Sequence, residues 1–404
     1  MPVGLTEPET LLPVPGIDLA AGSAGLYQKQ RSDLALLAME AGTICSAVFT
    51  NNQFCAAPVQ VARMHLQQSA PRYLIINAGN ANAGTGQRGV ADARQVCEAV
   101  AHIGNCDPSA VLPFSTGVIG EYLPVAKIQE KLPELFVTLA ADNWLPVVRA
   151  IMTTDTVAKA VSKQMEIDNH TITITGITKG SGMIRPDMAT MLAFVATDGK
   201  VEQKILDNIL RNAVEKSFNR ISVDGDTSTN DACVLLATGK SRCNLSNKPR
   251  NLALFEKAVT ELCVDLAQAI IRDGEGATKF ITVAVHEGHN QRECLQVAYA
   301  IAHSPLVKTA CFASDPNWGR ILAAIGRAGL PDLDIDRIRI YLDDTCIVER
   351  GMRAASYTEN AGQTVMRREE FTLQVYLGRG SAVDTIWTCD LSHEYVKINA
   401  EYRS

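Results

Sequence analysis

Short apolar runs rich in β-branched residues alternate along the chain with longer amphipathic stretches, and this alternation restricts the possible folds more than any other feature. Strand-like residues 73–76 precede a helical pattern over residues 92–103, and residues 194–196 precede another over residues 203–217. Strands that alternate with helices are typical of α/β proteins, in which helices cover the faces of a sheet. We therefore expect an α/β fold.

A third amphipathic stretch ends near a glycine. Its apolar residues recur at the spacing of one helix face: Leu252, Phe255, Val259, Leu262, Leu266 and Ile270. Lys257 and Arg272 lie off this face, and Gly274 follows at a position where glycine commonly ends a helix. The pattern predicts a helix that packs on the core of the protein.

The apolar runs become shorter and more strand-like from residue 281 onward. They cover residues 281–285, 339–342, 371–377 and 385–388. We expect a smaller, β-rich C-terminal α/β domain over residues 281–404, after a larger α/β domain over residues 1–280. A chain of 404 residues is long enough for two domains of about 100–200 residues each, or for one elaborated core.

Charge and cysteine usage exclude several classes of protein. The net charge is −6 and no run of Lys and Arg occurs, which argues against nucleic acid or an anionic membrane as the main partner. No apolar run approaches the about 20 residues that span a bilayer. The eleven cysteines are scattered without a CxxC motif, and the N-terminus lacks the pattern of a signal peptide. We expect a cytoplasmic protein with reduced thiols.

Two weaker motifs suggest a nucleotide or a metal. Residues Gly84 to Gly89 read G-x-G-x-x-G, as in a dinucleotide site, but residues 77–84 separate them from the preceding strand-like run, where the fingerprint has a tight turn. His286 and His289 flank two residues, yet no other Cys or His pair stands at ligand spacing. We expect a solvated turn at the histidines and no metal.

Polar and glycine residues gather in five segments at the ends of the expected elements. These segments are 115–117, 153–156, 179–183, 224–231 and 274–279. Each alone is typical of turns and helix caps. Together they indicate a site, because loops at the ends of α/β elements are where functional residues assemble.

The segment from Lys179 to Phe194 is the most unusual of these regions. Its glycines and Pro186 predict an irregular loop that enters an apolar strand, with Thr190 at the junction. Threonine is common in strands, so composition alone assigns Thr190 no special role.

The run Lys179–Leu192 resembles the self-processing segment of the ornithine acetyltransferase family, also called glutamate N-acetyltransferase, of arginine biosynthesis. The resemblance covers nearly the whole chain and includes residues 48–58, 80–86, 217–220, 224–231, 274–279, 314–320 and 399–404. It implies self-cleavage between Ala189 and Thr190, which gives an alpha chain of residues 1–189 and a beta chain of residues 190–404.

The resemblance further implies the reaction and its residues. Thr190 would take acetyl from N-acetylornithine and pass it to glutamate in a ping-pong transfer, with Thr116 and Gly117 as the oxyanion pair. The implied substrate contacts are Thr153, Lys179, Thr190, Glu275, Asn399 and Ser404. By charge, Lys179 suits the substrate carboxylate and Glu275 an amino group.

The resemblance also implies an α/β sandwich of αββα type, a heterotetramer of two alpha and two beta chains, and no cofactor. We expect acetyl-CoA as a second acetyl donor. A self-processing aminopeptidase or amidohydrolase is the nearest alternative, since it shares the nucleophile but passes the acyl group to water. An NAD-binding oxidoreductase that uses Gly84–Gly89, and a non-catalytic binding protein for acidic metabolites, both predict an uncut chain.

Overall fold

The computed structural model describes residues 2–27, 31–185 and 191–401. The chain divides into two compact units. The larger unit contains Glu7–Asn219 and Asp226–Ile270, and the smaller one contains Met1–Thr6, Arg220–Gly225 and Ile271–Ser404. The smaller unit therefore begins before the expected boundary at 280/281.

The larger unit contains two sheets. The four-stranded sheet has the order β1-β2-β4-β5, with β1 (Ile17–Gly22), β2 (Leu34–Met39), β4 (Tyr73–Asn77) and β5 (Val111–Ser115). The five-stranded sheet has the order β3-β10-β8-β7-β6, with β3 (Ile44–Phe49), β10 (Ala232–Ala237), β8 (Leu192–Thr197), β7 (His170–Lys179) and β6 (Lys159–Ile167). Every residue of β4, β5, β8 and β10 is buried, as expected for strands covered on both faces.

A shared core lies between the two sheets and contains apolar residues from both. The rings of Phe114 in β5 and Phe194 in β8 meet edge to face, with 5.1 Å between their centroids. Two helices, α1 (Ala57–Gln68) and α4 (Trp144–Ile151), also contribute to this core.

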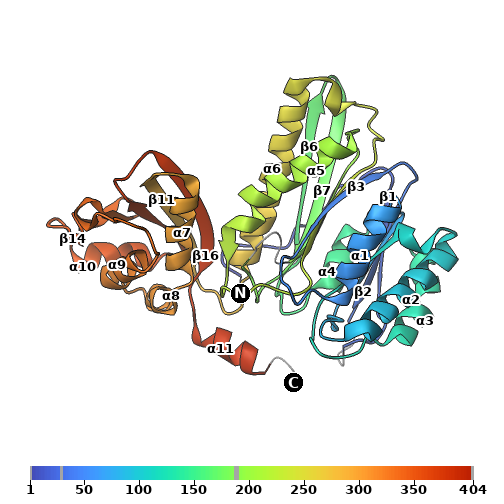
Figure 1. Ribbon diagram of the computed structural model, residues 1–404, viewed down its shortest axis with the longest axis horizontal. Coiled ribbons are helices and arrows are strands. Elements are labelled where there is room, and N and C mark those ends of the chain that lie inside the picture. Colours follow the sequence, from blue (N-terminus) through green and yellow to red (C-terminus); the bar gives the residue numbers. More distant parts are fainter. Residues whose placement is uncertain (1, 28–30, 186–190, 402–404) are drawn as a thin grey trace. The chain divides into compact units, whose positions relative to one another are not determined.

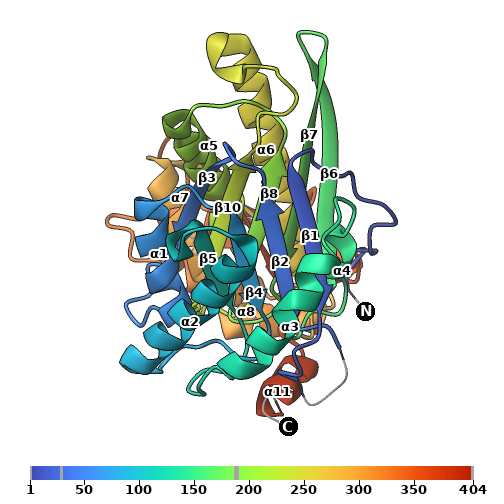
Figure 2. The same ribbon diagram turned by 90° about the vertical axis from the view of Figure 1, so that its right-hand side faces the viewer.

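Helices cover the outer faces of both sheets, as Figures 1 and 2 show. On the four-stranded sheet lie α2 (Gly86–Gly104) and α3 (Val125–Val137), and on the five-stranded sheet lie α5 (Gln203–Lys216) and α6 (Pro249–Arg272). A β-carbon on Gly176 of β7 would come within 2.7 Å of Leu262 in α6, which shows how closely this helix packs. The expected αββα sandwich is confirmed.

The smaller unit is built on a seven-stranded sheet of order β14-β13-β12-β15-β11-β16-β9. Its strands are β9 (Ile221–Ser222), β11 (Phe280–Gly288), β12 (Arg339–Leu342), β13 (Thr345–Glu349), β14 (Met352–Arg353), β15 (Glu370–Tyr376) and β16 (Ala382–Cys389). Its helices are α7 (Gln291–Ala302), α8 (Pro305–Phe312), α9 (Trp318–Gly326), α10 (Glu359–Met366) and α11 (His393–Ala400). Side chains of α7 to α10 form one core with the sheet. The β-rich character expected for this part of the chain is confirmed.

Four 3-10 turns complete the described elements: η1 (Pro108–Ala110), η2 (Phe218–Arg220), η3 (Leu245–Asn247) and η4 (Ile335–Arg337). The helix predicted around residues 252–270 is α6, and of its predicted core face Phe255, Val259, Leu262, Leu266 and Ile270 are fully buried. No helix in the described part of the chain is long and apolar enough to cross a membrane.

Candidate active site

Lys179, the last residue of β7, contacts two other residues expected at the site. Its ammonium donates to the hydroxyl oxygens of Thr153, at 2.8 Å, and Thr116, at 3.1 Å. Lys179 and Thr116 are each 9% exposed, so both side chains lie in the interior of the larger unit, and Thr153 is half-buried. Lys179 ends β7, Thr116 directly follows β5, and Thr153 lies in the segment after α4.

The backbone after β5 approaches another loop so closely that only glycine fits. Gly117 has φ 129°, and a β-carbon there would lie 2.4 Å from the carbonyl carbon of Gly79. The amide of Asn230 donates to the Ser115 carbonyl at 2.9 Å, and this bond fixes the end of β5. Thr116 and Gly117 are therefore held by their neighbours in a defined conformation.

The contact with Lys179 determines the direction of two hydroxyl groups. An ammonium has three donors and no acceptor, so the oxygens of Thr116 and Thr153 must accept from it. Their own hydrogens then point away from Lys179. Donors arranged around a lysine suit an oxygen atom that gains negative charge during a reaction.

A buried ion pair lies beside this cluster. The side chains of Asp155 and Lys159 are 0% exposed, with 2.6 Å between carboxylate and ammonium. Burial by itself would raise the pKa of Asp155, but the charges of Lys159 and Lys179 and a hydrogen bond from the Gly180 amide lower that pKa below its usual value. Asp155 is therefore an anion at neutral pH.

A second buried carboxyl, Asp231, has the opposite character. It directly precedes β10, and the next amide, that of Ala232, donates to the Met191 carbonyl at 2.9 Å. Burial raises the pKa of Asp231 well above its usual value, although Ser228 and the charge of Lys179 act to lower it. One carboxyl oxygen, Oδ2, has no hydrogen-bond partner in the described part of the chain. The surroundings of Asp231 thus favour the protonated form of its carboxyl group.

Two further residues expected at the site meet within the smaller unit. The side-chain amide of Asn399 in α11 donates to the Glu275 carboxylate at 2.7 Å. Glu275 is 7% exposed. Ala189, Thr190 and Ser404 lie outside the described residues, so the predictions for them stay predictions.

The weaker motifs gain no support from the structure. The cavity beside Gly84–Gly86 measures about 110 Å³, whereas ligand pockets are typically about 300–1,000 Å³. The expected solvated turn is wrong for His286, which lies in β11 and stacks on Tyr376 with 4.6 Å between ring centroids. His289 is exposed and lies in the bend between β11 and α7. Among residues 2–27, 31–185 and 191–401, no group of three or more His, Cys, Asp or Glu side chains has the arrangement of a metal site.

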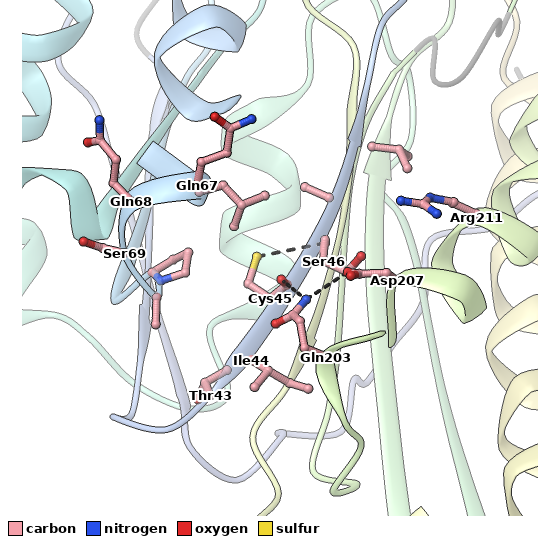
Figure 3. Close-up of a pocket in the computed structure, with 15 residues that line it drawn as sticks. Thr43, Ile44, Cys45, Ser46, Gln67, Gln68, Ser69, Gln203, Asp207 and Arg211 are labelled. Carbon is pink, nitrogen blue, oxygen red and sulfur yellow. Dashed lines mark hydrogen bonds between the residues drawn. The ribbon is translucent and has the colours of Figure 1, made fainter. Parts of the chain in front are cut away.

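A larger cavity, of about 490 Å³, lies along the edge strand β3 and contains none of the expected site residues. Figure 3 shows Gln203 of α5 beside this strand, where its amide donates to the Cys45 carbonyl and to Asp207, each at 2.9 Å. Burial raises the pKa of Cys45 to about 12, so the thiol stays protonated and is a poor nucleophile.

Sequence reasoning did not assign roles to Asp155, Lys159 or Asp231. Two of them lie in polar segments that were singled out, 153–156 and 224–231, and this clustering was the available signal. Lys159 follows Ala158 and opens a strand, where a lysine is normally exposed.

Comparison with known proteins places the chain in one family. The model of the ArgJ family matches residues 18–404. The arginine biosynthesis bifunctional protein ArgJ of Pseudomonas syringae pv. tomato is 54% identical over 407 residues, which cover 100% of both chains. The protein of the same name from Methylococcus capsulatus is 55% identical over 98% of this chain and 97% of its own.

A solved structure of the Bacillus halodurans ArgJ protein aligns with 51% of this chain and 97% of its own, at 38% identity and a TM-score of 0.49. The family model and the full-length relatives decide the assignment without it. The family model and these relatives cover the segments that contain Lys179, Thr116 and Thr153 and those that contain Glu275 and Asn399. The chain therefore belongs to the ArgJ family.

Proposed function

We propose that this protein transfers the acetyl group of N-acetylornithine to glutamate, giving ornithine and N-acetylglutamate, and that it also acetylates glutamate from acetyl-CoA. The observation that carries the proposal is membership of the ArgJ family over residues 18–404. Its relatives are named arginine biosynthesis bifunctional proteins, which supports two acetyl donors. The donor cluster of Lys179, Thr116 and Thr153 supports acyl transfer.

The active nucleophile arises by self-cleavage. The Thr190 hydroxyl attacks the Ala189 carbonyl, the amide becomes an ester, and water opens the ester to give chains of residues 1–189 and 190–404. This frees an amine on Thr190 with a pKa of roughly 8 before any influence of its surroundings, so the amine is a suitable base near neutral pH.

Transfer then takes place in two steps. The Thr190 oxygen attacks the acetyl carbon of N-acetylornithine, the amide bond breaks, and ornithine leaves with the proton from the hydroxyl. The amine of glutamate next attacks the acetyl ester and regenerates the hydroxyl. In both steps Thr116 and the backbone N–H of Gly117 stabilise the oxyanion, a role for which one donor is worth about 10²–10³ in rate.

The charges of Lys179 and Glu275 suggest which end of the substrate each one binds. Lys179 and Thr153 bind the carboxylate that both substrates carry, and Glu275, fixed by Asn399, binds an amino group. Asn399 and Ser404 complete the contacts near the C-terminus. Two alpha and two beta chains form a heterotetramer.

Cleavage and acceptor dependence test the proposal together. Purified protein should give two fragments that meet at Ala189/Thr190 on a denaturing gel with mass analysis, T190A should stay intact, and T190S should process slowly. Sustained release of ornithine from N-acetylornithine, beyond one equivalent per protein, should need glutamate. Acetyl-CoA and glutamate together should also yield N-acetylglutamate. Equally fast release without glutamate would instead identify an amidohydrolase.

A further inference from the structure

Asp155 makes three hydrogen bonds that join separate parts of the candidate site. Its Oδ2 accepts from the Thr153 amide at 2.9 Å, and its Oδ1 accepts from the Gly180 amide at 2.7 Å and from Lys159 at 2.6 Å. All bonds lie on one carboxylate with 0% exposure. A buried carboxylate with three donors is strongly fixed in place.

Two of these bonds reach the neighbours of the donor cluster. Thr153 receives a hydrogen bond from Lys179 through its hydroxyl and gives one to Asp155 through its amide. Gly180 directly follows Lys179, and its φ of 149° favours glycine. This backbone conformation lets the Gly180 amide donate to Asp155. The carboxylate thereby ties together the backbones that carry both cluster residues.

The two lysines near Asp155 have different surroundings. Lys159 forms the buried ion pair with Asp155, and Lys179 donates to the hydroxyls of Thr116 and Thr153. The charge of Lys179 also lowers the pKa of Asp155. Asp155 therefore acts on the candidate site through the Thr153 and Gly180 amides and through the charge of Lys179.

We propose that Asp155 is a positioning residue for substrate binding, which holds Thr153 and Lys179 in place for contact with the substrate carboxylate. This inference rests on the proposed function, since both N-acetylornithine and glutamate carry such a carboxylate. Lys159 neutralises the charge of the buried Asp155 carboxylate.

The test compares D155N, K159M and the double variant D155N/K159M with wild type. D155N should raise the KM of N-acetylornithine and of glutamate about tenfold or more, because a charge-assisted network is lost while the catalytic groups stay. The double variant removes both partners of the ion pair, which avoids an unpaired buried charge and protects folding. It should keep the raised KM even where its thermal stability returns towards that of wild type.

A purely structural role of the pair predicts a different pattern. The double variant would then recover both the stability and the KM of wild type, and that result would overturn the inference. An unchanged KM of cleaved D155N protein would overturn it as well. D198N is the matched control. Asp198 is also buried and accepts a hydrogen bond from the Thr173 amide at 2.9 Å, but it directly follows the C-terminal end of β8 and contacts none of the expected site residues in the described part of the chain. Its KM should match wild type. Wild-type protein without acetyl transfer would instead refute the proposed function.

Discussion

The ammonium of Lys179 donates to the hydroxyl oxygen of Thr116 across 63 positions of sequence, at 3.1 Å. The cation proposed to bind the substrate and the expected oxyanion donor are thus linked directly. Since the lysine only donates, the hydrogen of the Thr116 hydroxyl points away from Lys179, and the hydroxyl becomes a stronger donor to another acceptor.

A double-mutant cycle of K179M and T116V tests this link. T116V should lower kcat about 10²–10³-fold, the usual cost of one lost oxyanion donor. The double variant should be only slightly slower than the slower single variant, because the two residues act as a unit. Rates are taken per cleaved molecule from single-turnover kinetics. Effects that multiply would show that Lys179 and Thr116 act independently, and T116S should stay near wild type.

Asp231 predicts how stability depends on pH. Because its pKa is raised in the folded state, its favourable contribution is complete below the unfolded pKa, near 3.9, and is lost as pH rises through the folded value. D231N does not titrate, so its free energy of unfolding should improve relative to wild type between about pH 5 and about pH 9. Urea unfolding across this range measures the difference.

D168N is the control for that experiment. Hydrogen bonds from Lys248 and Asn251 lower the pKa of Asp168, so its titration is complete below the tested range. The difference between D168N and wild type should therefore not change with pH. A flat difference for D231N as well would mean that Asp231 is ionised in the folded protein.

Asn399 should act on substrate binding through Glu275. Its amide donates to the buried Glu275 carboxylate at 2.7 Å, and hydrogen bonds to charged groups are worth about 1.5–3 kcal/mol. N399A should raise the KM of N-acetylornithine roughly tenfold or more with a smaller change in kcat. K397A, on the same helix, removes only an exposed contact with Glu394 and should leave KM unchanged. Equal effects of both variants would assign the change to the helix, not to the hydrogen bond.

The packing of α6 on β7 predicts a cost for a methyl group at residue 176. In G176A the new β-carbon would lie 2.7 Å from Leu262 and 3.0 Å from Leu266, and such overpacking costs about 1–3 kcal/mol. Denaturant unfolding should show this loss. G326A in α9 is the control, because its β-carbon meets no atom within 4 Å. A G176A protein as stable as wild type would contradict the described helix position.

Much of the fold follows from local patterns, and the rest depends on distant partners. Helices α5 and α6 were predicted well because their apolar residues repeat every three or four positions. The arrangement of strands was not predictable, since β3 pairs with β10 and β8 pairs with both β7 and β10. Register between segments so far apart is set by tertiary packing.

The site shows the same limit. The sequence pattern singled out the segments of Thr116, Thr153 and Lys179, and the structure brings the three side chains together. Asp155, which accepts from the amides of Thr153 and Gly180, was not identified. Its role comes from burial and from contacts between distant segments, which a sequence does not display.

The central claim is acetyl transfer through a covalent acetyl-protein, and intact-mass analysis after mixing with one substrate tests it most directly. Cleaved protein mixed with N-acetylornithine alone should carry one acetyl group on the fragment of residues 190–404 and release ornithine in a single burst. Addition of glutamate should remove the acetyl group and yield N-acetylglutamate. A fragment that stays unmodified while transfer proceeds only with both substrates present would contradict the account.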